Sequence, residues 1–317
     1  MTATTGKMPI FNTDKSKGGP WLWFALLLVI FVAGDRLGGN VLHRLTAGSQ
    51  FRYSRLYAGA APAADILLVG NSRGLAFFQP FIEESTGKTT FNLSYNGMPS
   101  ALAEVLVKDY LARYPAPKTA LIDITLCDRP NKELIGGFST YLGYSAGLQA
   151  LIQAQNAEVS RGSKVSALFR YNNEVFQRAL FYRNRSDKDW LIDRQITPEL
   201  AATVPLDTFP ISVQPELIQP LAQTVKALQA SGTQVYLVIG PYYPGMTRDW
   251  SQLKRFKTAV KTATALTVHD YSQALADTRD FGDLMHPNKQ GAAHFIEKMR
   301  RDGLFTSEPT SGEAPDR

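Results

Sequence analysis

Two short stretches of the chain carry residue types that could act together in acyl-transfer chemistry. The first is Gly70-Asn71-Ser72-Arg73-Gly74, which follows a strand-like apolar run and precedes a helix-length segment. The second is Asp283-Leu284-Met285-His286, which comes directly before the last helix-length segment. An aspartate three residues before a histidine can accept the Nδ1 proton and leave Nε2 as a base toward a serine hydroxyl. The two stretches together predict a nucleophilic site made of Ser72, His286 and Asp283.

Each stretch alone has a simpler interpretation. Ser72 could be an ordinary helix cap, and His286 could be an exposed loop histidine beside a capping aspartate. The pentapeptide also fits G-x-S-x-G, the nucleophile elbow of α/β-hydrolases. Its position argues against that fold, because several strands normally precede the elbow and here the serine follows the first strand. The combination of both stretches, in this order, is what indicates catalysis.

The elements that must position these residues alternate between strands and helices. Short apolar runs typical of buried strands occupy residues 66–69, 90–93, 120–124, 235–239 and 266–268. Helix-length segments cover residues 74–85, 99–114, 214–231, 247–265 and 287–301. The alternation predicts an α/β domain over 65–305, with a parallel sheet covered by helices on both faces. A serine that follows the first strand would then lie at the carboxyl edge of the sheet, where such folds bind ligands.

Three segments depart from this alternation. Residues 132–205 are rich in Tyr, Phe and Arg and contain amphipathic stretches, which predicts a helical insertion over one end of the sheet. Residues 43–64 combine Arg, Ser, Tyr and Gly with an Ala-Pro stretch and are interpreted as a linker. Residues 306–317 have no apolar pattern, which predicts a disordered tail.

The N-terminal region predicts a membrane anchor. The polar residues 1–20 include three lysines, and Trp21–Ala33 has no polar side chain before Asp35-Arg36 interrupts the run. One helix over 21–42 reaches the ~20 residues that a membrane span needs, and the preceding lysines predict that residues 1–20 are cytoplasmic. The alternatives are a signal peptide cleaved near Val32-Ala33-Gly34 and a buried core helix. Both the anchor and the signal peptide would export the rest of the chain.

The composition excludes several classes of protein. With 44% hydrophobic and 20% charged residues, the chain can form a full core, so it is not disordered as a whole. A single cysteine, Cys127, excludes a disulfide framework, and with four scattered histidines it excludes a Cys/His zinc module. The net charge of +6 is not clustered, and no nucleic-acid-binding motif accompanies it. We therefore expect no metal, no cofactor and no nucleic-acid partner.

The order of the motifs resembles the SGNH, or GDSL-type, superfamily of hydrolases and acyltransferases, over roughly residues 65–303. Gly70-Asn71-Ser72 is similar to the first block of the family, with Asn71 in place of the usual aspartate. Phe91–Gly97 is similar to the second block, and Asp283 with His286 matches the fifth. The resemblance implies a three-layer, flavodoxin-like fold and a serine nucleophile.

The resemblance also implies an oxyanion hole, which one block leaves incomplete. The backbone N–H groups of Ser72 and Gly97 would hold the oxyanion. The third block of the family, Gly-x-Asn-Asp, has no counterpart in Thr125-Leu126-Cys127-Asp128, so its asparagine donor is missing. Asn96 and Asn71 are the candidate replacements. Arg73 is a candidate contact for an acidic group on the substrate, with a solvated surface arginine as the alternative.

A membrane anchor, a missing third block and a large insertion look most like the SGNH proteins of bacterial surface-polymer acylation. Examples are the alginate O-acetylation proteins and the lipoteichoic-acid D-alanylation protein. The resemblance implies a single-pass protein of the bacterial inner membrane with a periplasmic catalytic domain. Its expected function is transfer of a short acyl group, most simply acetyl, onto a cell-surface polysaccharide beside a membrane-bound O-acyltransferase. An esterase with the same three residues and a non-catalytic binding scaffold are the alternatives.

Overall fold

A five-stranded parallel sheet lies at the centre of the computed structural model, which describes residues 19–59, 63–188, 191–204, 213–246 and 251–305. The strands are β1 (Ile66–Val69), β2 (Thr90–Asn92), β3 (Thr119–Asp123), β4 (Gln234–Ile239) and β5 (Val268–Asp270). All four pairings are parallel, in the order β2-β1-β3-β4-β5. The predicted α/β fold class is therefore confirmed.

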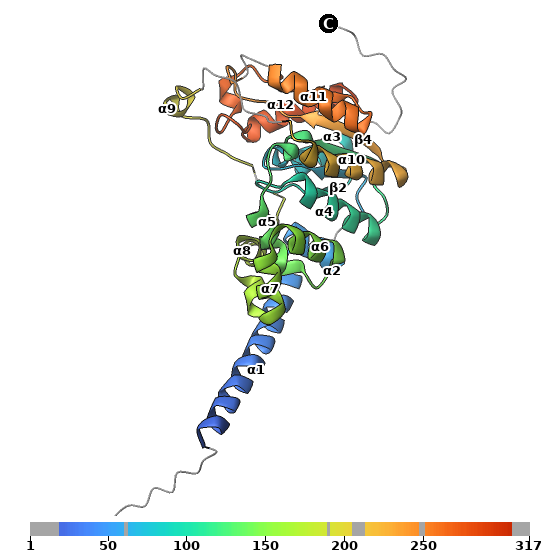
Figure 1. The fold of residues 1–317 in the computed structure, drawn as a ribbon. Coiled ribbons are helices and arrows are strands. Elements are labelled where there is room, and N and C mark those ends of the chain that lie inside the picture. Colours follow the sequence, from blue (N-terminus) through green and yellow to red (C-terminus); the bar gives the residue numbers. More distant parts are fainter. Residues whose placement is uncertain (1–18, 60–62, 189–190, 205–212, 247–250, 306–317) are drawn as a thin grey trace, which may run out of the picture.

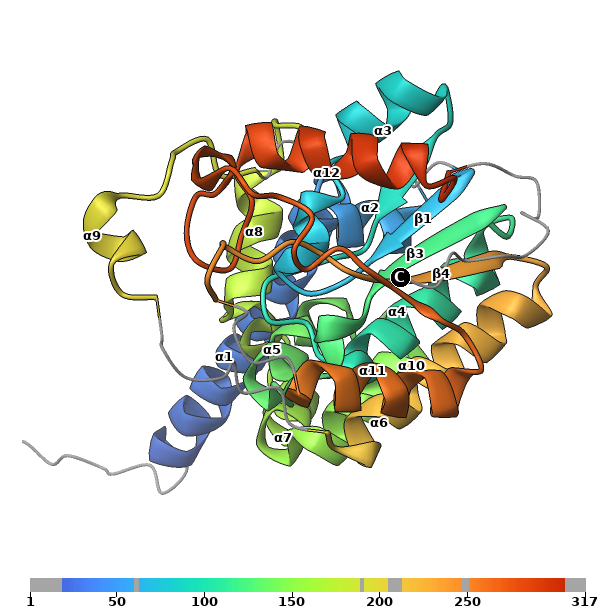
Figure 2. The same cartoon turned by 90° about the horizontal axis from the view of Figure 1, so that it is seen from above.

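Helices cover both faces of the sheet, as Figure 2 shows. On one side lie α4 (Ser100–Arg113), α10 (Pro215–Ala230) and α11 (Ser251–Thr264). Helix α10 packs against both α4 and α11. On the other side α3 (Gln79–Thr86) packs against α12 (Lys289–Arg301). Because both faces are covered, every residue of β1 and β3 is buried, which explains why these strands read as continuous apolar runs.

The prediction of one continuous helix over residues 74–85 is wrong, because this segment forms two separate elements. A 3-10 helix, η1 (Arg73–Ala76), follows β1, and α3 begins separately at Gln79. Pro80 stands in the first turn of α3, where its fixed φ and missing N–H favour the start of a new helix. The break leaves a short, compact turn directly after β1.

The strand order creates a crevice beside β1. From β1 the chain moves to the edge strand β2 and then returns to β3 on the other side of β1. Loops that leave the carboxyl ends of β1 and β3 therefore diverge, and open α/β sheets bind ligands at such a switch point. Ser72 follows the end of β1 at this place.

Residues 132–205 lie between β3 and β4, and most of their described residues are helical. A short 3-10 helix, η2 (Ile124–Cys127), leads from β3 into this region. Its elements are α5 (Lys132–Gly137), η3 (Phe138–Tyr141), α6 (Ala146–Gln155), α7 (Ala157–Val165), η4 (Leu168–Tyr171), α8 (Glu174–Phe181) and α9 (Pro198–Ala201). Helices α5 to α8 lie between the sheet and the N-terminal helix α1 (Gly19–Ala47), as Figure 1 shows.

The interpretation of residues 43–64 as a linker is wrong for much of that segment. Residues 43–47 continue α1, and α2 (Arg52–Ala58) follows. Phe51, Tyr53 and Leu56 are fully buried, and the Tyr53 ring lies 4.8 Å from that of Phe138 in the insertion. A seven-residue helix owes its stability to such tertiary packing, so local composition alone does not reveal it.

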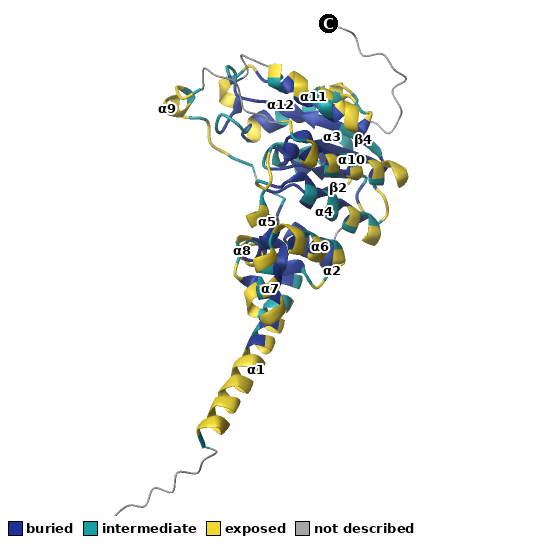
Figure 3. Ribbon diagram, viewed as in Figure 1, coloured by how far each residue is buried: buried dark blue, intermediate teal, exposed yellow. Residues whose placement is uncertain are grey.

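Helix α1 extends from the body of the molecule and is long and apolar enough to cross a membrane, the one such helix among the described residues. It is longer than the predicted span over 21–42 at both ends. Its apolar side chains from Trp21 to Val32 are exposed, which Figure 3 shows as a continuous exposed rod. The expected cytoplasmic segment before residue 19 and the expected tail over 306–317 lie outside the described residues.

Candidate active site

Ser72 occupies a compact turn at the carboxyl end of β1. Gly70 and Gly74 flank it, and a Cβ atom on Gly70 would lie 2.7 Å from the Cα of Gly74 and 3.1 Å from the Cβ of Asp123. The chain therefore folds back on itself too closely for any side chain at residue 70. The Gly74 N–H donates to the Asn71 carbonyl at 3.1 Å and closes the turn. Gly74 is needed as well, because a Cβ atom there would lie 2.5 Å from Ser94 Oγ.

His286 and Asp283 lie on a tight loop before α12. An antiparallel bridge joins Phe281 to Pro287, and the Gly282 N–H donates to the His286 carbonyl at 3.0 Å. Asp283 Oδ1 accepts the backbone N–H groups of Met285 at 2.8 Å and His286 at 2.9 Å. The carboxylate that faces the imidazole therefore also shapes the loop that carries it.

The structure brings the three predicted residues together in one chain of hydrogen bonds. His286 Nε2 lies 2.9 Å from Ser72 Oγ. On the other side of the ring, Nδ1 lies 2.9 Å from Asp283 Oδ1 and 3.0 Å from Oδ2. With Nδ1–H donating to the carboxylate, Nε2 can accept the hydroxyl proton of Ser72. The side chains of His286 and Asp283 are 27% and 26% exposed, so a ligand can reach them.

Asp283 remains ionised over a wide pH range. Partial burial raises the pKa of its carboxyl group, but the hydrogen bond and charge of His286 and the two backbone N–H groups outweigh burial. The net effect holds the pKa of Asp283 below its ordinary value of 3.8. An ionised carboxylate is the state that can orient and stabilise an imidazolium at His286.

A pocket of about 480 Å³ opens at these side chains. This volume suits a short acyl group together with part of a larger acceptor. The lining residues are Ser72, Leu75, Ala76, Asn96, Arg178, Tyr182, Leu191, Ile192, Asp283, His286 and Pro287. Four of them come from the insertion, which therefore forms one wall of the site.

Sequence reasoning placed the insertion over one end of the sheet but did not identify Arg178, Leu191 or Ile192 as residues of the site. Arg178 is the one Arg or Lys among the lining residues, and it projects from α8. Leu191 and Ile192 are held beside the histidine loop, because the Lys289 N–H donates to the Ile192 carbonyl at 2.9 Å. No local pattern in residues 178–192 marks these contacts, since they depend on the fold of the whole insertion.

The two predicted backbone oxyanion donors, Ser72 and Gly97, follow the carboxyl ends of β1 and β2. Gly97 belongs to the loop after β2, and the Asn131 side chain donates to its carbonyl at 2.9 Å. Within the described part of the chain, the backbone N–H groups of Ser72 and Gly97 are bonded to no protein acceptor. Asn96 is exposed and lines the pocket together with Ser72. Gly97 itself is not among the lining residues.

The expectation for Asn71 is corrected by its surroundings. Asn71 is 6% exposed and does not line the pocket. Its Oδ1 accepts the Arg73 N–H at 2.9 Å and the Thr125 hydroxyl at 3.2 Å. The side-chain oxygen of Asn71 therefore stabilises the turn around Ser72. The third block of the family would follow β3, where the chain instead forms η2. None of the described pocket-lining residues comes from η2.

The expectation for Arg73 as a substrate contact is also wrong. Its side chain is 4% exposed, and the guanidinium lies 3.6 Å from the centre of the Tyr242 ring. Nη1 donates to the Met285 carbonyl at 2.5 Å, and Nη2 donates to the carbonyls of Gly240 at 2.5 Å and Pro241 at 2.9 Å. Arg73 therefore links the nucleophile turn to the loop of His286 from beneath the pocket.

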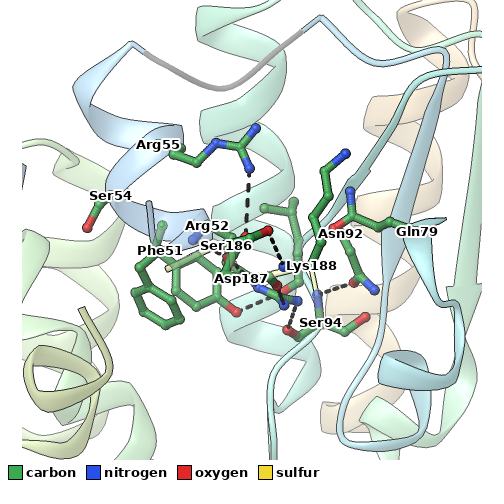
Figure 4. Close-up of polar contacts among 12 residues, drawn as sticks. Phe51, Arg52, Ser54, Arg55, Gln79, Asn92, Ser94, Ser186, Asp187 and Lys188 are labelled. Carbon is green, nitrogen blue, oxygen red and sulfur yellow. Dashed lines mark hydrogen bonds and ion pairs between the residues drawn. The ribbon is translucent and has the colours of Figure 1, made fainter. Parts of the chain in front are cut away.

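A buried ion pair supports the oxyanion side of the site (Figure 4). Arg52 of α2 and Asp187 near the end of the insertion are 3% and 2% exposed, with Nε 3.2 Å from Oδ2. Arg52 Nη1 also donates to the Ser94 carbonyl at 2.9 Å, three residues before Gly97. Figure 4 shows that Arg52 connects three segments that are far apart in the sequence.

Other chemically reactive side chains lie outside the pocket. Cys127 is buried, and burial raises the pKa of its thiol, which keeps it protonated and unreactive. His294 is exposed and pairs at 2.9 Å with Asp280, which is buried, and His269 lies on β5. Among the described residues, no group of three His, Cys, Asp or Glu side chains is arranged to hold a metal ion.

Comparison with known proteins gives little direct guidance. No protein-family model matches the chain, and no curated protein matches it. Among solved structures, a GDSL-like lipase from Bacteroides thetaiotaomicron aligns over 80% of this chain and 97% of its own, with a TM-score of 0.39 and 10% identity.

Proposed function

We propose that the chain is an SGNH-type serine acyltransferase that moves an acetyl or other short acyl group onto a cell-surface polysaccharide. The observation that carries this proposal is the hydrogen-bonded chain Ser72–His286–Asp283 at a pocket open to ligands. The order of the motifs, with Ser72 after β1 and Asp283 with His286 before α12, supports the SGNH assignment.

The first half of the reaction acylates the serine. Ser72 Oγ attacks the carbonyl carbon of an acyl donor while His286 Nε2 takes the hydroxyl proton. The backbone N–H groups of Ser72 and Gly97, with the side chain of Asn96, stabilise the negative charge on the carbonyl oxygen. The imidazolium then gives its proton to the leaving group, and the acyl group remains on Ser72.

The second half transfers the acyl group to an acceptor. His286 removes the proton of a sugar hydroxyl, whose oxygen attacks the acyl carbon and displaces Ser72 Oγ. Ser72 recovers its proton from His286, so the triad returns to its starting state. Arg178 and Tyr182, on the insertion wall, are placed to bind the acceptor.

The anchor supports a function at a membrane surface. In the proposal α1 crosses the bacterial inner membrane once and holds the catalytic domain in the periplasm. There the donor acyl group would come from a membrane-bound O-acyltransferase. No cofactor takes part in the proposed reaction, because every proton and bond change is accounted for by the triad and the two substrates.

An esterase is the second candidate, because the exposed sides of His286 and Asp283 also admit water. The full chain in detergent is incubated with an activated acetyl ester, with and without acetylatable oligosaccharide, and the Ser72→Ala variant is the control. Transfer predicts that acetyl appears on the sugar and that free acetate falls correspondingly. Release of the same acetate at every sugar concentration would make the protein an esterase, and no difference from Ser72→Ala would leave it non-catalytic.

A further inference from the structure

The acidic residue in the middle of α1 is hydrogen-bonded by the protein itself. Asp35 is the one acidic residue of α1, and it is only 7% exposed although most of its helical neighbours are exposed. Its carboxylate accepts hydrogen bonds from the Ser166 hydroxyl at 2.5 Å, the Ala167 N–H at 2.8 Å and the Leu168 N–H at 3.1 Å. All three donors belong to the junction between α7 and η4.

This junction lies directly against α1. A Cβ atom on Gly39 would come within 2.5 Å of the Ala167 Cβ, so only glycine permits the approach. Arg36 Nη2 adds a hydrogen bond to the Val165 carbonyl at 3.1 Å. Residues 165–169 are therefore fixed beside residues 35–39 of α1. Figure 1 shows α7 at the end of the body from which α1 emerges.

The apolar surface of α1 continues past Asp35. Leu37 is 67% exposed and Val41 is 57% exposed, on the side of the helix away from the junction. A hydrocarbon core ~30 Å thick takes about 20 helical residues, so a span that begins at Trp21 ends near Val41. At 1.5 Å per residue, residues 35–39 and the junction packed on them would then lie ~3–9 Å inside the outer boundary of the hydrocarbon.

The junction exposes the residue types that favour such a boundary. Val165 is 78% exposed, Phe169 43% and Leu168 41%. Two exposed basic residues of α7, Arg161 and Lys164, stand beside them. Apolar side chains flanked by Lys or Arg are typical of segments that enter the interface of an anionic membrane.

We propose that residues 165–169 form a membrane-contact loop, which enters the outer part of the hydrocarbon and holds the catalytic domain in a fixed orientation on the bilayer. The inference rests on the proposed function in one respect, since α1 must span a membrane. In this arrangement the hydrogen bonds of Asp35 join the anchor to the catalytic domain, and its carboxylate does not face lipid.

The test uses nitroxide spin labels on the full chain in nanodiscs of phosphatidylethanolamine and phosphatidylglycerol. The label is attached at Val165→Cys, with Val29→Cys as a reference within α1 and Leu200→Cys in α9 as the exposed control remote from α1. The native thiol, Cys127, is buried and does not compete for the label. Power saturation compares collision of each label with oxygen, which enters lipid, and with a water-soluble nickel complex.

We expect the label at Val165 to be reached by oxygen and protected from nickel, at a shallower depth than the label at Val29. The label at Leu200 is expected to show the opposite preference. A Val165 label that behaves like the Leu200 label, while Val29 is immersed, would overturn the membrane-contact loop and leave the anchor intact. A Val29 label that is exposed to water would overturn both the membrane-contact loop and the assignment of α1 as a membrane anchor. A label at Phe169→Cys repeats the test should the first variant fail to fold.

Discussion

Arg73 offers a test of how the fold positions the catalytic base. Its guanidinium makes three hydrogen bonds of 2.5 to 2.9 Å to main-chain carbonyls, one of them that of Met285, the residue before His286. Arg73→Lys keeps the charge but loses the planar fork that reaches several carbonyls at once. Hydrogen bonds to charged groups contribute about 1.5–3 kcal/mol each, so loss of one or two lowers the free energy of unfolding by roughly 2–5 kcal/mol.

The effect on activity follows from the position of Met285 next to His286. Misplacement of a catalytic group by about 1 Å costs roughly 100-fold in rate. We therefore expect Arg73→Lys to lower kcat by about 10- to 100-fold with an activated acetyl ester, at nearly unchanged KM. Steady-state kinetics measure both constants, below the melting temperature of the variant.

Arg178→Lys is the matched control, because Arg178 lines the pocket whereas Arg73 lies beneath it. With an acidic oligosaccharide as acceptor, this control is expected to raise KM for the acceptor and to change kcat little. The opposite pattern, with Arg73→Lys raising KM at constant kcat, would show that Arg73 contacts the substrate. It would refute the positioning role.

Three further predictions concern the remaining polar groups. Asp283→Asn places an amide N–H against Nδ1 and forces the proton onto Nε2, so we expect kcat to fall about 10³- to 10⁴-fold. Because the pKa of Asp283 is lowered in the folded chain, its ionised form stabilises the fold above pH 3.8, and the stability difference between wild type and Asp283→Asn shrinks as pH falls below that value. Cys127 is expected to resist iodoacetamide in the native chain and to react in urea, as mass spectrometry would show. Arg52→Met removes the guanidinium closest to the buried Asp187 and leaves only Arg55, whose Nη1 lies 3.7 Å from Oδ1, to pair with it. We expect the free energy of unfolding to fall by up to about 3–5 kcal/mol, and adding Asp187→Leu to restore most of the loss in urea titration.

Each of these predictions has a clear contrary result. Full activity of Asp283→Asn would mean that the carboxylate does not fix the histidine tautomer, and a pH-independent stability difference would contradict the lowered pKa. Alkylation of Cys127 in the native chain would contradict its burial. A double variant at Arg52 and Asp187 no more stable than Arg52→Met would show that the weakened pairing of Asp187 is not the cause of the loss.

The sheet could be predicted from the sequence because its information is local. Each inner strand is buried on both faces, so it appears as an apolar run bounded by polar residues. The helices between strands have lengths that follow from the same alternation. Ser72 and the Asp283–His286 pair follow or precede such elements directly, which is why their meeting at one sheet edge could be anticipated.

What could not be predicted depends on contacts between distant residues. Phe51 and Tyr53 look like linker residues in the sequence, but in the fold Phe51 stacks on Tyr182 and Tyr53 packs against Phe138, both from the insertion. Arg73 looks like a surface arginine beside the nucleophile, and only the fold places the carbonyls of Gly240 and Met285 around it. No short-range pattern encodes either arrangement.

The central claim is that Ser72 is a nucleophile activated by His286. The most direct measurement is the intact mass of the full chain after brief exposure to an activated acetyl ester, followed by peptide mapping, with Ser72→Ala and His286→Ala in parallel. We expect one acetyl group on Ser72 in the wild type, none at that position in Ser72→Ala, and much slower formation in His286→Ala. Equal acetylation of wild type and Ser72→Ala, or none on the Ser72 peptide, would contradict the account.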